Sequence, residues 1–178
     1  MRISKGKKIR IVCLSAVCLA LCMVLPFLTG MIPVIGKALC PMHIPVLICG
    51  AICGPWWGAL VGVIAPLLRG VLFGAPELIP TGLSMAAELF GYGFFMGVFV
   101  KILPRKAPYL YVSLIFSMLA GRIVGGVSKI VLLTSGILEE YSFALFFSGY
   151  FVNSLPALAI QLVLVPPIIY AVKKAKIV

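Results

Sequence analysis

Long apolar runs, each close to the length of a membrane span, divide this chain into six segments. They cover residues 10–29, 44–54, 56–73, 81–102, 109–134 and 143–172. The apolar residues are continuous and do not alternate with polar ones, which favours helices over the strands of a β-barrel. A helix needs roughly 20 apolar residues to cross the hydrocarbon of a bilayer. The pattern predicts an all-α integral membrane protein, with six transmembrane helices in a single domain over residues 1–178.

The second and third segments are short, and a Gly-Pro-Trp-Trp-Gly sequence separates them. Gly54 can end one helix, and Pro55 suits the first turn of the next. Trp56 and Trp57 are typical of the aromatic belt at a membrane surface. The N-terminal apolar run is longer than the core of a signal peptide, so we expect it to remain as the first span.

Composition and charge placement give the orientation. The chain is 63% hydrophobic and only 11% charged, which excludes a soluble domain. Most of its basic residues fall before the first span, between the fourth and fifth, and after the sixth. They are Arg2, Lys5, Lys7, Lys8, Arg10, Lys101, Arg105, Lys106, Lys173, Lys174 and Lys176. With six spans these groups share one side of the membrane, so the positive-inside rule predicts that both termini are cytoplasmic.

Several classes of function are disfavoured by the same composition. The net charge of +11 comes without a basic-aromatic surface, so we expect no nucleic-acid binding. Five of the six cysteines lie in apolar runs, no Cys-x-x-Cys pair occurs, and the chain has one histidine. We therefore expect no metal site, no disulfide framework and no cofactor. With one histidine and four acidic residues, the sequence also offers little for an enzyme.

Polar residues inside the spans gather in the outer half of the membrane when depth is counted at about 1.5 Å per residue. They are His43, Arg69, Glu88, Arg122, Lys129 and Asn153. His43 opens the second span on the external side in this arrangement. A charged side chain at the centre of a span costs on the order of 2.5–3.5 kcal/mol, so these groups need partners, water or a ligand. Tyr92 and Tyr150 are aromatic candidates for the wall of a binding site.

Two interpretations of these charges stay open. In the first, Glu88 pairs with Arg122, while Arg69 and Lys129 extend to external headgroups. In the second, the groups line an outward-facing pocket for a small anion. Three cations outnumber one carboxylate, which leaves a surplus of two positive charges. Arg122 and Lys129 lie two turns apart on one helix face, and a guanidinium suits a carboxylate or phosphate.

Small residues mark places where helices can approach closely. Ala16 and Ala20 form such a pair in the first span. Similar positions occur in the fourth and fifth spans, at Gly91, Gly93, Gly97, Gly121 and Gly125. The spacing alone does not distinguish contacts within the chain from contacts with a partner.

Two stretches carry a resemblance to a known family. They are "HIPVLICGAICGPWWGALVGVIAPLL", from His43 to Leu68, and "APELIPTGLSMAAELFGYGFFMG", from Ala75 to Gly97. With six short helices, a basic N-terminus and the alanine pair, the chain resembles the substrate-binding S component of an energy-coupling factor (ECF) transporter. The resemblance covers nearly the whole chain.

The resemblance implies a subunit that binds one vitamin at an outward-facing site in the plasma membrane of a prokaryote. Its lid would be the loop from Gly30 to Pro41, and Ala16 and Ala20 would dock on a transmembrane coupling subunit driven by two ATPase subunits. Because the outer half has surplus cations, the expected ligand is a small carboxylate, with pantothenate first and folate or niacin next. Thiamin is disfavoured because it is cationic, whereas riboflavin and pyrimidine precursors stay open.

A self-sufficient secondary transporter or channel, acting as an oligomer, is the alternative. It would need a coupling-ion site near the midplane or inverted repeats, and we see neither in the sequence. Co-purification with an ATPase module would separate the two functions. A small membrane scaffold or enzyme is a third and weaker candidate.

Overall fold

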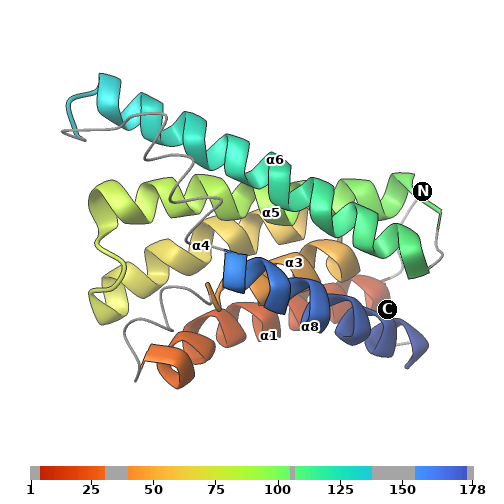
Figure 1. The fold of residues 1–178 in the computed structure, drawn as a ribbon. Coiled ribbons are helices and arrows are strands. Elements are labelled where there is room, and N and C mark those ends of the chain that lie inside the picture. Colours follow the sequence, from red (N-terminus) through yellow and green to blue (C-terminus); the bar gives the residue numbers. More distant parts are fainter. Residues whose placement is uncertain (1–4, 31–39, 105–106, 138–154, 176–178) are drawn as a thin grey trace.

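The structure, a computed structural model, describes residues 5–30, 40–104, 107–137 and 155–175. Its elements are α1 (Lys5–Gly30), α3 (His43–Cys53), α4 (Pro55–Phe73), the π-helical turn η1 (Leu78–Gly82), α5 (Leu83–Ile102), α6 (Ala107–Thr134) and α8 (Leu155–Lys174). Five of these helical segments are long and apolar enough to cross a membrane, and α3 is shorter (Figure 1). The prediction of an all-α integral membrane protein is confirmed.

The helix bounds follow the predicted spans closely from the second to the fifth. The first helix begins earlier than predicted, because the basic residues from Lys5 to Arg10 continue it. Lysine and arginine are good helix formers, so the charges that mark a membrane boundary do not end a helix. The last helix begins at Leu155, whereas the predicted span began at residue 143, and residues 143–154 lie outside the described part.

The break between α3 and α4 forms as predicted. Gly54 ends α3 with φ 104°, and its N–H donates to the carbonyl of Gly50 at 3.2 Å. Pro55 then begins α4. A positive φ is readily adopted only by glycine, and proline is preorganised for a first helical turn. Gly54 is therefore the only residue between the end of α3 and the start of α4.

The two ends of the bundle differ in charge. The start of α1 and the ends of α5 and α8 lie together, at the right of Figure 1. We call this the basic end, because it carries lysines of all three helices. The prediction that both termini are cytoplasmic would place this end in the cytoplasm. We call the opposite end, where α4 and α6 finish, the outer end.

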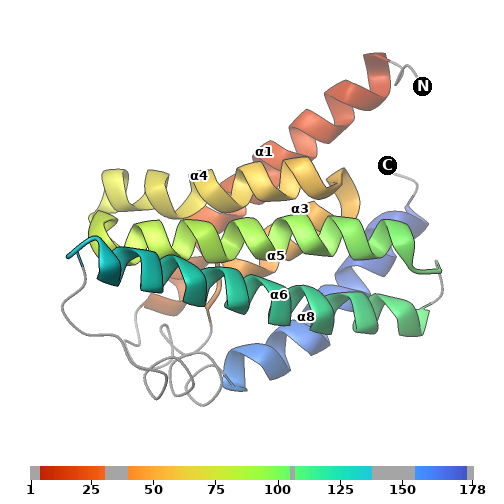
Figure 2. The ribbon, with the colours of Figure 1, turned by 90° about the horizontal axis from the view of Figure 1, so that it is seen from above.

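Helix α5 lies at the centre of the bundle and packs against α3, α4 and α6 (Figure 2). Glycines make these contacts close. A Cβ atom on Gly58 would lie 2.6 Å from both the Cα of Gly50 and the carbonyl oxygen of Gly93. A Cβ atom on Gly91 would lie 2.8 Å from the Cα of Gly121. The predicted small-residue faces of α5 and α6 therefore contact neighbouring helices, as small residues do in membrane bundles.

Small and sulfur-bearing side chains fill the seam between α1 and α3. The Sγ of Cys49 lies 3.7 Å from the Oγ of Ser15, and the Sγ of Cys53 lies 3.8 Å from the carbonyl oxygen of Ile11. Cys22 contacts the carbonyl oxygen of Met42 through its Sγ at 3.6 Å. These thiols are free and buried, and they act as small packing groups.

Candidate functional site

The length of the short helix α3 determines how far His43 lies from the basic end of the bundle. At about 1.5 Å per residue, the 11 residues of α3 place His43 ~15 Å from its end at Cys53. Tyr92 lies at the same level in α5, ~15 Å from Ile102. Glu88 and Arg122 lie roughly one turn further out, in α5 and α6. His43 and Tyr92 therefore lie at one level of the bundle, and Glu88 and Arg122 lie closer to the outer end.

Glu88 and His43 form a buried ion-pair contact. The Oε1 of Glu88 lies 3.6 Å from the Nε2 of His43. Glu88 is 9% exposed and His43 is 5% exposed. The separation is longer than a good hydrogen bond, so the pairing is loose. The Nδ1 of His43 is buried and has no hydrogen-bond partner within the described residues. An orphaned buried nitrogen is costly, and it is satisfied when a ligand or water reaches it.

Arg122 reaches Tyr92 on the neighbouring helix. Its Nε donates to the Tyr92 hydroxyl at 3.2 Å, and the two side chains are only 5% and 2% exposed. The Tyr92 ring also packs edge-on against the His43 ring, with centroids 5.0 Å apart. The Gly91–Gly121 contact brings α5 and α6 close enough for this bond. We call His43, Glu88, Tyr92 and Arg122 the buried polar cluster.

Two further residues lie near the buried polar cluster. Lys129 lies two turns beyond Arg122 and is half-buried. It is close enough to Glu88 for the two side chains to interact electrostatically. Cys40 precedes α3 and has φ 46°. Its thiol interacts electrostatically with both Glu88 and Arg122. Burial raises the pKa of Cys40 to about 11, and the Glu88 carboxylate adds to that rise. Cys40 was not among the predicted site residues, and its only signal in the sequence is that it is the one cysteine outside an apolar run.

Arg69 has a different environment. Its Nη1 donates to the carbonyl oxygen of Met23 in α1 at 3.1 Å. Its guanidinium carbon lies 5.0 Å from the ring centroid of Phe27 and 5.9 Å from that of Phe73. These contacts join the outer part of α4 to α1 through a hydrogen bond and cation–π contacts. Arg69 thus lies against a pair of aromatic rings that also contact each other, and its described contacts do not include the buried polar cluster.

Other predicted residues are described only in part. Tyr150 and Asn153 lie outside the described residues, as does most of the predicted lid from Gly30 to Pro41. Ala16 and Ala20 lie on α1 and are both exposed, while the seam with α3 occupies the opposite face of the helix. The alanine pair is therefore available to a partner and does not serve packing within the described bundle.

The charges near the buried polar cluster are unequal among the described residues. Arg122 and Lys129 are two basic side chains near one carboxylate, Glu88, which contacts His43. This leaves a surplus of one positive charge among the described residues, smaller than the two predicted, because the described contacts of Arg69 lie elsewhere. Charges held at membrane depth are costly unless they are compensated. A bound monoanion would compensate this surplus, and Glu88 and the His43 Nδ1 could bind its polar groups.

A cavity of about 710 Å³ lies elsewhere, at the basic end. None of the predicted ligand-binding residues in the described part of the chain lines it. The members of the buried polar cluster have low exposure. The predicted ligand-binding residues in the described part therefore lie away from this cavity.

Comparison with known families shows which family the chain matches. A family model described as "ECF transporter, substrate-specific component" matches residues 10–169. No curated protein and no solved structure matches the chain. The matched range includes every described member of the candidate site.

Proposed function

This chain belongs to the family of substrate-specific components of ECF transporters, and on that premise we propose that it captures a small carboxylate, with pantothenate first, from outside the cell. Members of this family bind small molecules and dock with a transmembrane coupling subunit and ATPase subunits. The proposed role here is capture and delivery of the ligand, without chemistry on it. The protein is proposed to act as one domain in a prokaryotic plasma membrane, with both termini in the cytoplasm.

The observation that carries the ligand class is the surplus of one positive charge around the buried polar cluster. A carboxylate between Arg122 and Lys129 would compensate that surplus through charge-assisted hydrogen bonds. The start of α3 adds to the attraction, because a helix N-terminus carries partial positive charge. Pantothenate also bears hydroxyl and amide groups. These can bind Glu88 and the unpartnered Nδ1 of His43, while the Tyr92 ring forms a wall.

The outer segments complete the proposed site. Tyr150, Asn153 and the lid from Gly30 to Pro41 are proposed to cover the ligand from outside. Arg69 is proposed to contribute at the edge of the site by fixing the end of α4 against α1. Its described contacts support this positioning role more directly than contact with the ligand.

The same charge argument ranks other ligands. Niacin and folate carry carboxylates and remain candidates after pantothenate. Thiamin would add a cation to a site that already has a surplus of positive charge. Riboflavin would leave the surplus uncompensated, so neutral ligands rank below acids.

Docking on the coupling subunit is proposed to use the exposed face of α1. Ala16 and Ala20 leave a shallow surface there, and small residues let a second helix approach closely. Their exposure supports this role, because the packing of α1 on α3 uses Ser15, Cys22 and other residues of the opposite face.

The test is a ligand panel on purified protein, read by native mass spectrometry and thermal shift. A ligand that binds the folded state raises its apparent stability, by ~2.7 kcal/mol at 100 times the dissociation constant. We expect one strong hit with an acidic vitamin. A hit with thiamin or a neutral vitamin alone would refute the proposed ligand class. Failure to co-purify with an ATPase module would favour a self-sufficient transporter.

A further inference from the structure

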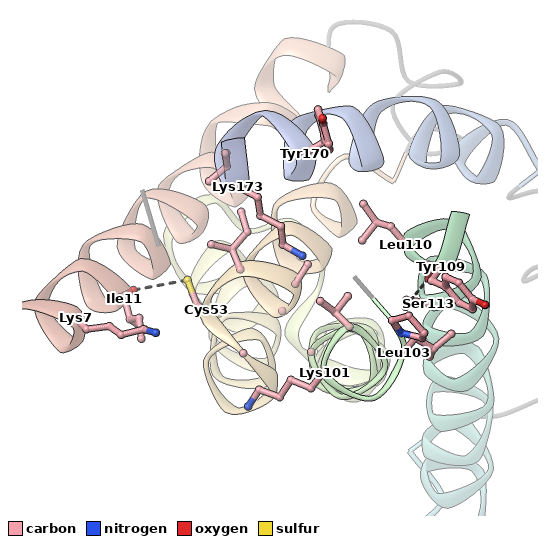
Figure 3. Close-up of a pocket in the computed structure, with 18 residues that line it drawn as sticks. Lys7, Ile11, Cys53, Lys101, Leu103, Tyr109, Leu110, Ser113, Tyr170 and Lys173 are labelled. Atoms are coloured by element: carbon pink, nitrogen blue, oxygen red, sulfur yellow. Dashed lines mark hydrogen bonds between the residues drawn. The ribbon is translucent and has the colours of Figure 1, made fainter. Parts of the chain in front are cut away.

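The cavity at the basic end has a chemistry of its own. Its volume is about 710 Å³, and α1, α3, α5, α6 and α8 all contribute to its wall (Figure 3). Three lysines line it, Lys7 from α1, Lys101 from α5 and Lys173 from α8. No acidic residue is among its described lining residues. Lysines from three separate helices therefore line one cavity, and its described lining residues include no carboxylate side chain.

The lysines surround a wall that is formed largely by backbone and small residues. Gly50, Gly54 and Gly97 contribute to this wall. The Nζ of Lys101 lies 3.6 Å from the position of a Cβ atom on Gly54, so the lysine extends back over the α3–α4 break. Figure 3 shows the amines of Lys7 and Lys173 turned toward the cavity from different sides. The glycines leave room between the amines for a group of several atoms.

Apolar side chains form much of the rest of the cavity wall, and Tyr109, Ser113 and Tyr170 add polar groups. The larger apolar residues are Ile11, Ile52, Val100, Leu103, Leu110 and Val172. Beside the opening, Ile102 is 72% exposed and Tyr170 is 62% exposed on the outside of the bundle. A molecule at this position would therefore meet cations at the membrane edge and an apolar surface next to them.

We propose that this cavity binds the phosphate headgroup of an anionic phospholipid from the cytoplasmic leaflet. The lysines would bind the phosphate, and the acyl chains would lie on the apolar outside of the bundle. Basic pockets between helices on the cytoplasmic side favour such headgroups. A free phosphate would gain nothing from the adjoining apolar surface, so the lipid is favoured. The site lies at the opposite end from the buried polar cluster and does not depend on the transported ligand.

The test uses the full-length protein and a variant in which the three lysines become glutamine (Lys7→Gln, Lys101→Gln and Lys173→Gln). Native mass spectrometry measures binding of phosphatidylglycerol to detergent-purified protein. Phosphatidylcholine and glycerol phosphate serve as the zwitterionic and the chain-free probes. A lysine near a membrane surface contributes roughly fivefold in affinity for anionic lipid. We expect the triple variant to bind phosphatidylglycerol on the order of 10- to 100-fold more weakly.

A matched control removes the same charge from the same end of the protein. It replaces Lys8, Arg10 and Lys174, which are exposed but do not line the cavity, with glutamine. We expect this control to bind phosphatidylglycerol within a few-fold of the wild type. Thermal-shift midpoints of all three proteins establish that each is folded.

Several outcomes would overturn the proposal. Equal losses in the triple variant and the control would show general attraction to basic residues. If phosphatidylcholine bound as tightly as phosphatidylglycerol, the lysines would not be selecting an anionic headgroup. If glycerol phosphate bound as tightly as phosphatidylglycerol, the acyl chains would not contribute to binding. Loss of ATPase-module co-purification in the triple variant, with lipid binding unchanged, would assign the cavity to a protein partner.

Discussion

Replacing Arg122 with glutamine separates the two interpretations of the buried polar cluster. If Arg122 mainly supports the fold, its role is the hydrogen bond to the Tyr92 hydroxyl at 3.2 Å. If it binds the ligand, its loss removes a charge-assisted contact to a carboxylate. Arg122→Gln removes both, whereas Tyr92→Phe removes the hydroxyl and keeps both the arginine and the aromatic ring against His43.

The expected magnitudes differ between these variants. A hydrogen bond to a charged group contributes ~1.5–3 kcal/mol, so Arg122→Gln should weaken binding of an acidic vitamin about 10- to 150-fold. Tyr92→Phe removes a hydrogen bond within the protein and no contact to the carboxylate, so it should lower stability and change affinity by no more than about fivefold. Both variants should lower the thermal midpoint, since each breaks a contact between α5 and α6.

A double variant guards against loss of folding. Arg122→Gln leaves the Glu88 carboxylate buried with less compensation, which destabilises the protein. Arg122→Gln combined with Glu88→Gln removes both charges, so its thermal midpoint should recover while its affinity stays low. Calorimetric dissociation constants and thermal midpoints are measured for all four proteins. Equal affinity losses in Tyr92→Phe and Arg122→Gln, or an unchanged affinity in Arg122→Gln, would refute ligand contact by Arg122.

Three other predictions address neighbouring features of the molecule. Gly121→Leu should lower the thermal midpoint and weaken ligand binding, because a Cβ atom there would lie 2.8 Å from the Tyr92 ring. Gly6→Ala, where nothing lies within 4 Å, is its control and should change neither quantity. Ala16→Leu with Ala20→Leu should abolish co-purification with the coupling subunit at unchanged ligand affinity; loss of ligand binding would refute a role confined to docking. Because its pKa is raised from 9.0 to about 11, Cys40 should be alkylated roughly 100-fold more slowly at pH 8 than in the unfolded protein, and faster as pH rises toward 11; equal rates at pH 8 would contradict this.

Much of the fold follows from local rules that the sequence displays. Apolar run length predicts the helices, and the Gly54–Pro55 pair predicts the break between α3 and α4, because each depends on neighbouring residues. The start of α1 was less predictable, since lysine and arginine mark a membrane boundary without ending a helix. Charge placement predicted that the first and last helices meet at one end.

The candidate site was only partly predictable, because its contacts join residues far apart in the sequence. Depth counting placed Glu88 and Arg122 at similar levels in the membrane. It could not show that Glu88 contacts His43, which depends on how α3 packs against α5. It also could not place Arg69 against the Phe27–Phe73 pair, since that contact requires the position of α1 against α4.

The most direct test of the central claim compares acids with their neutral partners. Binding calorimetry on the wild-type protein would use two matched pairs, pantothenate with its alcohol analogue panthenol, and niacin with nicotinamide. Each pair differs in the carboxylate that the surplus charge near Arg122 and Lys129 is proposed to bind. We predict that one acid binds at least about tenfold more tightly than its neutral partner, as loss of a charge-assisted contact requires. Equal binding within both pairs, or tight binding of a neutral partner alone, would contradict the account.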